Sequence, residues 1–586
     1  MAKRWRIAAH DPGRISALEK SAGVPSVVAQ LLVARGIEDP QAVRDFLDPK
    51  LTGLRDPLEL PGVPQATEVI GRSIQAGEPI VVYGDYDADG MTAAAILMRC
   101  LRLLGADVRF YVPHRIEEGY GLNHDALRTL AARGARTVVT VDCGVASLAE
   151  ADTAKELGLN LVITDHHKMA ERLPDAAAIV HPGLPLGDGA AGYPFTGLCG
   201  AAVAFKLAWA LCQNASQAKR VSEPMRRFLM QAVGLAAIGT VADVVPLVDE
   251  NRILVRNGLG ALRHNPTPGF KELERVGQLT KKPELGGEDL AFAIAPRLNA
   301  AGRLGQAELG VELLTTDDAA RATELADYID ELNETRKSVE RSVLLSARKQ
   351  AKQLYDPDND PALVLAGHDW HPGVIGIVAG KLAEQHHKPV VVVSLDKQGV
   401  KPGIGSGRSI PGFDLHHAFA AAGEHLESHG GHAAAAGLRV KESNLDAFRI
   451  DFCAHAASQL GSEGNGAELA IDAETALSAL THQTVCQIER LAPFGHGNQR
   501  PTLCASDVRL ASAPRRMGGA GRHLSVDLEQ HGVKLRAVAF GAGDWEDSLQ
   551  QVNGPLSVAF RPVINTFRGY RTVEVHLEDW REEGAS

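Results

Sequence analysis

Short apolar runs alternate with helix-like segments from about Glu78 onwards. The runs PIVVYGD, VRFYVP, TVVTVDC and LVITDHH are rich in β-branched residues, and stretches such as MTAAAILMRCLRLLG and SLAEADTAKELG lie between them. Strands and helices of these lengths in alternation indicate βαβ units and a parallel sheet. Because ligands of such sheets bind beyond the carboxyl ends of the strands, a functional site is expected there.

The pattern changes on both sides of this region. Residues from about Asp317 to Leu354 are charged, have helical periodicity and contain no Gly or Pro, which predicts a solvated connecting helix. Roughly from Pro361 to Leu460, the strands ALVLAG and PVVVVS and then Gly-rich turns indicate a second α/β region. After Pro493, five short β-like runs suggest a small β-barrel: TLCASDVRL, HLSVDLE, LRAVAFG, LSVAFRPVI and RTVEVHL.

We therefore predict an α/β protein of several domains, since 586 residues are too many for one hydrophobic core. The predicted division is an N-terminal segment of helices and loops at 1–70, a parallel-sheet domain at 71–315, a connecting helix at 316–355, a second α/β domain at 356–462 and a β-barrel at 463–586.

Composition and charge change this picture little. Hydrophobic residues make up 45% and charged residues 23%, as in ordinary globular proteins. No run approaches the roughly 18 apolar residues of a membrane span, and the start MAKRWRIAAHDPGR lacks the apolar core of a signal peptide, so we expect a cytoplasmic protein without a membrane partner. The 7 cysteines form no CxxC pair, which argues against a zinc site or a disulfide framework. The net charge of −11 argues only weakly against a nucleic-acid partner, because total charge does not report its distribution.

Metal-binding side chains follow three of the four predicted strands of the first domain. Apart from these, one carboxylate, Asp243, lies within the apolar stretch GLAAIGTVADVVPL. Carboxylates gathered at one sheet edge repel one another unless cations neutralise them, and oxygen ligands with histidine favour Mg²⁺ or Mn²⁺. Two such ions roughly 3.5–4 Å apart can promote an in-line phosphoryl displacement. The side chains at the strand ends are Asp85, Asp87 and Asp89, then Asp142, then Asp165, His166 and His167.

Each of these signals alone has an ordinary explanation. A DxDxD sequence occurs in calcium loops and solvated turns, and Asp142 alone is compatible with a helix cap. Asp243 is less easily explained, because a carboxylate in an apolar run needs a partner. Their occurrence together, in order and at strand ends, favours a metal centre.

The motifs YGDYDADGMT, VDCG, DHH and GTVADVVPL, in this order, resemble the four phosphoesterase motifs of the DHH superfamily, and the first and fourth resemble those of RecJ exonucleases. The resemblance implies that His167 lies beside the scissile phosphate, that Asp165 supports the histidines and that Asp85 orients ligands rather than binding metal. It also implies two Mn²⁺ or Mg²⁺ ions, bridged by Asp142 and held by Asp87, Asp89, Asp142, His166 and Asp243.

The resemblance extends from about residue 50 to the end and implies substrate contacts. YVPHRIEEGYGL supplies Arg115, and APRLNAAGRLG supplies Arg297, Asn299 and Arg303. The segments GSGRSIPGFDL and SHGGHAAAAGL resemble the DHH-associated domain, where a terminal phosphate would contact Ser406, Arg408, Gly430, Gly431 and His432. The tail resembles the OB fold of the family, and its candidate groove residues are Arg515, Arg516, Arg522, Arg561, Phe567, Arg568, Tyr570 and Arg571, with Phe540 and Phe560 expected in the core.

The residues and the resemblance together predict metal-dependent phosphodiester cleavage, and the resemblance implies an exonuclease that degrades single-stranded DNA from its 5′ end to mononucleotides in DNA repair and recombination. The alternative is a DHH phosphodiesterase for short oligonucleotides or cyclic dinucleotides, which would not need the tail. A catalytically inactive replication scaffold would lack metal ligands, and none is missing here. An inorganic pyrophosphatase would not explain the tail. The expected partners are single-stranded DNA, a single-stranded-DNA-binding protein and a helicase, and the expected state is a monomer.

Overall fold

A parallel β-sheet forms the centre of the first large domain, as the alternating pattern predicts. The computed structural model describes residues 3–114, 118–119, 121–185, 192–217, 220–356, 360–460, 468–552, 554–567 and 570–583. In this domain the strands pair in the order β3-β2-β4-β5-β6, and every pairing is parallel. Their bounds are β2 (Ile80–Gly84), β3 (Val108–Tyr111), β4 (Thr137–Val141), β5 (Asn160–Thr164) and β6 (Ala178–Val180).

Both faces of this sheet are covered by helices. Val82 and Val139 pack in the larger core, whereas Tyr83 and Val138, which point to the opposite face, pack with α6 (His124–Ala132) and α7 (Leu148–Glu156). A parallel sheet buried on both faces is the usual result of βαβ connections. The predicted boundary at residue 70 falls inside α4 (Val63–Ala76), which packs in the larger core together with α5 (Ala88–Leu103), α8 (Gly200–Ser216), α9 (Glu223–Ala242) and later helices.

A long helix, α15 (Ala319–Leu354), connects this domain to the next, as predicted. Its first half contributes Leu325 and Ile329 to the larger core, and its second half contributes Val343 and Ala347 to the core of the second domain. The helix therefore carries a buried stripe on each half, and it is less solvated than the charge pattern predicts. Before it come α10 (Asp249–His264), α11 (Pro268–Val276), α12 (Gly287–Asp289), α13 (Ala295–Arg303) and α14 (Ala307–Thr315).

The second α/β domain contains a mixed sheet of order β10-β11-β9-β8-β7, in which only β7 and β8 are parallel. The stretches predicted as Gly-rich turns are in fact strands β9 and β10. A Cβ at Gly405 would lie 2.6 Å from Leu438, and one at Gly407 would lie 2.9 Å from Phe419, so glycine lets β9 approach its neighbours closely. The elements are β7 (Leu363–Gly367), α16 (Ile375–His386), β8 (Val390–Ser394), β9 (Gly403–Arg408), α17 (Leu415–Ala421), β10 (Leu426–Gly431), β11 (Ala435–Val440) and α18 (Leu445–Leu460).

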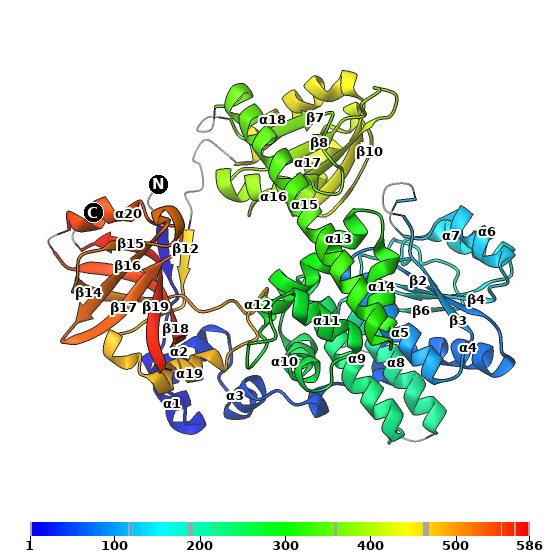
Figure 1. Ribbon diagram of the computed structural model, residues 1–586, viewed down its shortest axis with the longest axis horizontal. Coiled ribbons are helices and arrows are strands. Elements are labelled where there is room, and N and C mark those ends of the chain that lie inside the picture. Colours follow the sequence, from blue (N-terminus) through cyan, green and yellow to red (C-terminus); the bar gives the residue numbers. More distant parts are fainter. Residues whose placement is uncertain are drawn as a thin grey trace.

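The C-terminal domain is an OB-like sheet in which all five predicted runs form strands. The strand order is β13-β14-β18-β19-β17-β16-β15, and β14 also pairs with β16, so five strands form a ring of pairings. Figure 1 shows this domain on the left, the parallel-sheet domain on the right and the second α/β domain above them. The elements are β13 (Ala473–Glu474), α19 (His482–Glu489), β14 (Leu503–Leu510), β15 (Arg515–Met517), β16 (His523–Gln530), β17 (Val533–Ala539), α20 (Trp545–Gln550), β18 (Leu556–Phe567) and β19 (Tyr570–Glu582).

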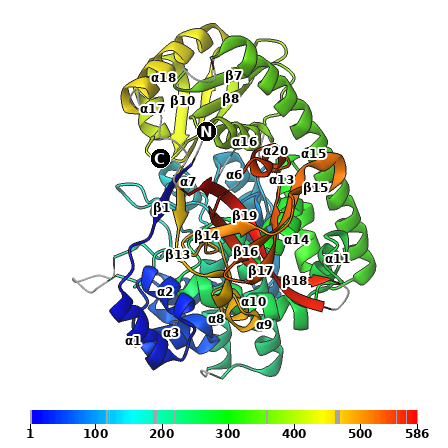
Figure 2. The same ribbon diagram turned by 90° about the vertical axis from the view of Figure 1, so that its left-hand side faces the viewer.

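The N-terminal segment packs against this C-terminal domain (Figure 2). Leu18 and Leu31 lie in the same core as Val526 and Phe560. Its first strand, β1 (Arg4–Ile7), pairs in parallel with β12 (Glu468–Ile471), a strand that the sequence did not predict because it depends on so distant a partner. The helices here are α1 (Pro12–Ala22), α2 (Ser26–Ala34) and α3 (Pro40–Leu47). Among the described residues, no helix is both long and apolar enough to cross a bilayer.

Candidate active site

Two aspartates begin helix α5 directly beyond the carboxyl end of β2. Asp87 is the N-cap of α5 and accepts a hydrogen bond from the Gly90 N–H at 3.0 Å, while Asp89 lies in the first turn. Asp85 follows the strand directly and is buried. Because an N-cap carboxylate and a helix N-terminus attract each other, the DxDxD motif acquires a fixed local shape.

The Asp89 carboxylate is held by the start of another helix. Its oxygens accept the backbone N–H groups of Gly200 at 2.7 Å and Ala201 at 2.9 Å, the first two residues of α8. Burial, followed by the nearby charge of Asp87, raises the pKa of Asp89 to about 6. The N-terminus of α8 thus orients the Asp89 carboxylate, but its two amide hydrogen bonds do not offset the effects of burial and of the Asp87 charge.

Asp142 follows β4 and has a left-handed backbone, with φ 62°. Burial raises its pKa well above the ordinary value, and the carboxylates of Asp89, Asp87, Asp85 and Asp243 add to the effect. Gathering so many carboxylates around one buried aspartate is electrostatically costly unless cations are bound among them.

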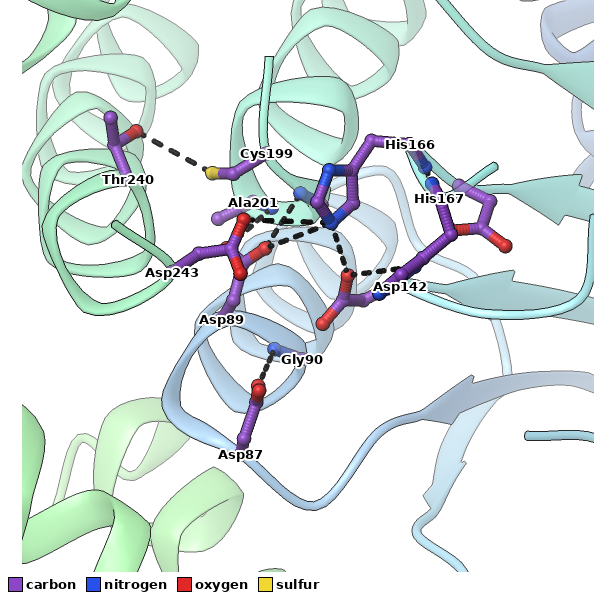
Figure 3. A network of polar contacts seen from close by, with 12 residues as sticks. Asp87, Asp89, Gly90, Asp142, His166, His167, Cys199, Ala201, Thr240 and Asp243 are labelled. Carbon is purple, nitrogen blue, oxygen red and sulfur yellow. Dashed lines mark hydrogen bonds and ion pairs between the residues drawn. The ribbon is translucent and has the colours of Figure 1, made fainter. Parts of the chain in front are cut away.

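His166, directly after Asp165 beyond β5, directs its Nε2 atom at three of these carboxylates (Figure 3). The distances from Nε2 are 3.1 Å to Asp142 Oδ1, 3.6 Å to Asp243 Oδ2 and 3.9 Å to Asp89 Oδ2. Among the described residues, this buried nitrogen has no hydrogen-bond partner. Burial, with the positive charge of His167, lowers the pKa of His166 to about 3, which leaves a neutral imidazole with a lone pair for a metal.

His167 has a different environment. Its Nδ1 atom lies 2.8 Å from Asp165 Oδ1 and 3.9 Å from Asp142 Oδ1. Burial opposes the imidazolium form, but the hydrogen bond and charge of Asp165 raise the pKa of His167 to about 9. Burial likewise opposes ionisation of Asp165, yet hydrogen bonds from His167 and the Val145 N–H lower its pKa to about 2. The contact with Asp165 therefore favours the protonated form of His167.

Asp243 caps the C-terminal end of α9, and the residue after it is strained. Burial, followed by the charges of Asp89 and Asp87, raises the pKa of Asp243 to about 8. Val244 has φ 60°, a left-handed conformation that a β-branched side chain rarely adopts, and it is 65% exposed. Strain of this kind is retained where surrounding contacts enforce it, often next to functional groups.

The arrangement provides three overlapping sets of ligand atoms. Within each set the potential ligand atoms lie within 4.8 Å of one another. Asp142 belongs to two sets and His166 to two, so cations in adjacent sets would share ligands. Oxygens with neutral imidazole fit Mg²⁺ and Mn²⁺. The structure brings together every residue predicted to bind metal, and Asp85 joins them; the sets are Asp142–His166–His167, Asp89–His166–Asp243 and Asp85–Asp87–Asp142.

The predicted substrate residues of α13 mostly contact protein. Asn299 accepts the Ala88 N–H at 2.8 Å and so supports the DxDxD loop. Arg297 donates to Asp330 at 2.8 Å and to two backbone carbonyls, so its guanidinium is held in place within its own domain. Arg303 donates to the Gly373 carbonyl at 3.0 Å, a contact between the two α/β domains. Arg115 lies outside the described residues.

The predicted phosphate-binding residues of the second domain lie near one end of its sheet. Arg408 ends β9 and donates to Ser406 Oγ at 3.0 Å, and the register pairs it with Ala435. Gly431 ends the neighbouring hairpin strand opposite Ala436, with exposed Gly430 before it and exposed His432 after it. A Cβ at Gly376, in the first turn of α16, would lie 2.9 Å from an Arg408 nitrogen, so the helix start adjoins the arginine.

In the OB-like domain the structure corrects one prediction. Phe560 is fully buried, as expected, but Phe540 is 59% exposed and not a core residue. Its ring contacts His576, with centroids 4.9 Å apart, and His523, at 5.4 Å. The run LRAVAFG did not reveal this exposure, because Phe540 follows the end of β17 and strand alternation no longer applies there.

The predicted groove residues of this domain have varied surroundings. Arg516 pairs with Glu546 at 2.7 Å, and Arg561 pairs with Glu578 at 3.3 Å. Arg515 and Arg522 are exposed, as are Tyr570 and Arg571 on β19, whereas Arg568 and the Phe567 side chain lie outside the described part.

Two glycines of the site were missed. A Cβ at Gly200 would lie 2.6 Å from the Asp142 side chain, and one at Gly239 would collide with Asp89 and Ala201. Both positions keep helices α8 and α9 close enough to the sheet edge for their ligands and amides to reach the site. Single-sequence reasoning offers no signal for them, since glycine is common and its neighbours become visible only in the fold.

Comparison with known proteins agrees with this geometry. Three family models match: the DHH family N-terminal domain at residues 79–240, the DHHA1 domain at 359–457 and the RecJ OB domain at 471–579. The parallel sheet and its edge of carboxylates and histidines, together with these matches, define a phosphoesterase of the DHH class.

Relatives over nearly the full length give the narrower assignment. The single-stranded-DNA-specific exonuclease RecJ of Dickeya dadantii is 36% identical over 95% of this chain and 96% of its own, and that of Bacillus subtilis is 34% identical over 98% and 70%. RecJ from Thermus thermophilus, solved with Mn²⁺, has a TM-score of 0.83 at 31% identity and covers 99% of this chain and 80% of its own. The chain belongs to the RecJ family of single-stranded-DNA-specific exonucleases.

Proposed function

We propose that this chain is a metal-dependent exonuclease that hydrolyses single-stranded DNA from the 5′ end and releases mononucleotides. The observation that carries the proposal is the convergence of Asp89, Asp142 and Asp243 on the Nε2 atom of a neutral, buried His166. Carboxylates gathered so closely repel one another unless cations are bound among them.

Two Mn²⁺ or Mg²⁺ ions would be held by Asp87, Asp89, Asp142, His166 and Asp243, of which Asp142 belongs to two of the ligand sets. Bound as a pair, these cations activate an attacking water and stabilise the charge on both oxygens of an in-line displacement. The chain itself fixes the ligands before the substrate arrives. The amides of α8 orient Asp89, and Asp165 keeps His167 protonated, so that Nε2 of His167 can donate to a phosphoryl oxygen.

The second α/β domain would set the polarity of cleavage. Ser406 and Arg408 lie beside the start of α16, where backbone amides favour an anion. Arginine can bind a terminal phosphate through paired hydrogen bonds, and the hairpin of Gly430, Gly431 and His432 lies at the same end of the sheet. A 5′-phosphate bound there would place the adjoining phosphodiester toward the metal centre.

The strand beyond the cleavage point would follow two neighbouring cavities toward the OB-like domain. One, of about 870 Å³, is lined by Val244 beside Asp243 and by the exposed Phe292. The other, of about 590 Å³, is lined by Phe540, Trp545 and His576, and both cavities share Glu288, Arg500 and Arg561. Aromatic rings and arginines in series suit successive bases and phosphates of a single strand.

The test is hydrolysis of oligonucleotides labelled at either end, single- and double-stranded, with Mn²⁺ and after chelation. We expect mononucleotides to be released from the 5′ end of single strands only, and no release without metal. Preferential cleavage of di- or trinucleotides, with long strands left intact, would instead support the phosphodiesterase for short oligonucleotides. Roles in repair and recombination, a single-stranded-DNA-binding protein and a helicase as partners, a monomeric state and a cytoplasmic location remain part of the proposal.

A further inference from the structure

Three consecutive polar residues at the start of α10 are buried, which is unusual outside a functional site. Glu250 and Asn251 are 0% exposed and Arg252 is 3% exposed. Burying polar groups costs free energy unless each finds a partner, so their partners indicate what they hold together. Glu250 accepts from the Arg55 N–H, Tyr193 and Lys206 inside the parallel-sheet domain. The other two residues reach different parts of the molecule.

Asn251 connects the two segments that carry metal-site groups. Its amide nitrogen donates to the Gly197 carbonyl at 2.6 Å and to the Pro246 carbonyl at 3.0 Å. Gly197 lies three residues before Gly200, whose N–H orients Asp89, and Pro246 lies three residues after Asp243. Within the described chain, the Asn251 Oδ1 atom has no hydrogen-bond partner, so the side chain is retained for its donors despite that cost.

Arg252 connects the same helix to the segment that leads into the OB-like domain. Its guanidinium donates to the carbonyls of Leu491 at 2.8 Å, Ala492 at 3.0 Å and Phe46 at 2.9 Å, and it lies 3.7 Å from the Phe46 ring centroid. Leu491 belongs to the core of the OB-like domain. A buried guanidinium held by carbonyls alone acts as a multidentate clamp that lysine cannot reproduce.

The segment after Leu491 then returns to the metal site. The Leu247 N–H donates to the His496 carbonyl at 2.7 Å. A Cβ at Gly495 would lie 2.7 Å from Leu247, and one at Gly497 would lie 3.0 Å from Pro246. Pro246 and Leu247 are therefore held between Asn251 on one side and residues 495–497 on the other, only a few residues after Asp243 and the left-handed Val244.

We infer that Asn251 and Arg252 are positioning residues. They couple the position of the OB-like domain to the distance between Asp89 and Asp243 in the metal site. The inference rests on the proposed metal centre. The Arg252 guanidinium touches neither ligand. It can act on the Asp243 segment through residues 490–497, which it contacts, and through its own helix, where Asn251 is its neighbour and its N–H donates to the Val248 carbonyl at 3.2 Å.

The test is Mn²⁺ affinity, measured by electron paramagnetic resonance of free Mn²⁺ with the full-length protein, beside thermal unfolding of the metal-free protein. We expect Arg252→Ala and Asn251→Ala each to weaken Mn²⁺ binding about tenfold, as for other residues that orient metal ligands, and Arg252→Lys to weaken it less. Hydrolysis should recover when Mn²⁺ is raised to saturation. The matched control is Arg256→Ala, an exposed arginine on the next turn of α10, which should bind Mn²⁺ normally.

Asp89→Asn and Asp243→Asn distinguish a failure of the proposed metal centre from a failure of the positioning role. If neither weakens Mn²⁺ binding, the proposed metal centre itself is wrong. If both do, but folded Arg252→Lys and Asn251→Ala proteins bind Mn²⁺ like the unaltered chain, only the positioning role is overturned, even where their unfolding temperature has fallen. Should Arg252→Ala not fold, the lysine variant and Asn251→Ala decide the question.

Discussion

At the residue scale, the proposed metal centre depends as much on close approach as on its charged ligands. Gly200 donates its own N–H to Asp89, and a Cβ at this position would lie 2.6 Å from the Asp142 side chain, so any side chain there would displace Asp142. Asp142 itself has a left-handed backbone directly after β4, at the carboxyl end of the strand. Ligand chemistry and backbone geometry therefore act together at single positions.

The most direct prediction concerns Asp142. Asp142→Ala should lower the rate of hydrolysis about a thousandfold or more, because the ligand shared between two ion sets is lost and several kcal/mol of charge stabilisation go with it. Binding of single-stranded DNA should remain measurable by fluorescence anisotropy, since the strand contacts lie elsewhere. Full activity in this variant would remove the bridging role.

Gly200→Ala gives a subtler test. The added methyl group would lie 2.6 Å from the Asp142 side chain, so we expect about tenfold weaker Mn²⁺ binding by calorimetry. Gly260→Ala in α10 is the matched control, because a Cβ there meets nothing within 4 Å. Equal Mn²⁺ affinity for the two variants would contradict the packing argument.

At the scale of elements, strand β9 shows how one sequence run serves two purposes. Its glycines at 403, 405 and 407 face a tightly packed neighbour, while Ser406 and Arg408 point to the other side, toward α16. Period-two alternation of this kind is the ordinary geometry of a strand. The Gly-rich motif was predicted to be a turn because alternation of glycine with larger residues carries no hydrophobic signal.

Arg408→Ala should therefore affect substrates with a 5′-phosphate selectively. The loss of charge-assisted hydrogen bonds, typically about 1.5–3 kcal/mol, should raise KM for 5′-phosphorylated single strands by one to two orders of magnitude. KM for strands with a 5′-hydroxyl should change little in the same steady-state assay. Arg439→Ala, an exposed arginine on neighbouring β11, is the control. An equal rise for both kinds of strand would argue against a phosphate pocket.

At the scale of the whole molecule, the chain's two ends belong to one unit. Strand β1 pairs with β12, and helices α1 to α3 share the core of the OB-like domain. Removing the residues after Leu460 would expose that shared core and break the contacts of Arg252, so truncation is a poor test of the domain's role. Substitution on its surface is the sharper experiment.

Phe540→Ala should weaken the processing of long single strands only. Stacking of one base on an aromatic ring contributes about 1–3 kcal/mol, so KM for a strand that spans both cavities should rise about tenfold, while KM for a trinucleotide should not change. Tyr570→Ala is the informative control, because Tyr570 is 78% exposed but lines neither cavity. If Tyr570→Ala had the larger effect, the strand would follow the surface predicted from sequence and not the Phe540 platform.

The sequence by itself determined the parallel sheet, the connecting helix, the five strands of the tail and the carboxylates and histidines that gather at the sheet edge. These follow from local periodicity and from the rule that the carboxyl ends of parallel strands share one edge. Only the tertiary structure decided the rest: the strand β1, the exposure of Phe540, the structural contacts of Arg297, the glycines at positions 200 and 239 and the buried Asn251 and Arg252. Each of these depends on partners far away in the chain, and the free energy of burial and hydrogen bonding is set by those partners and not by neighbouring residues.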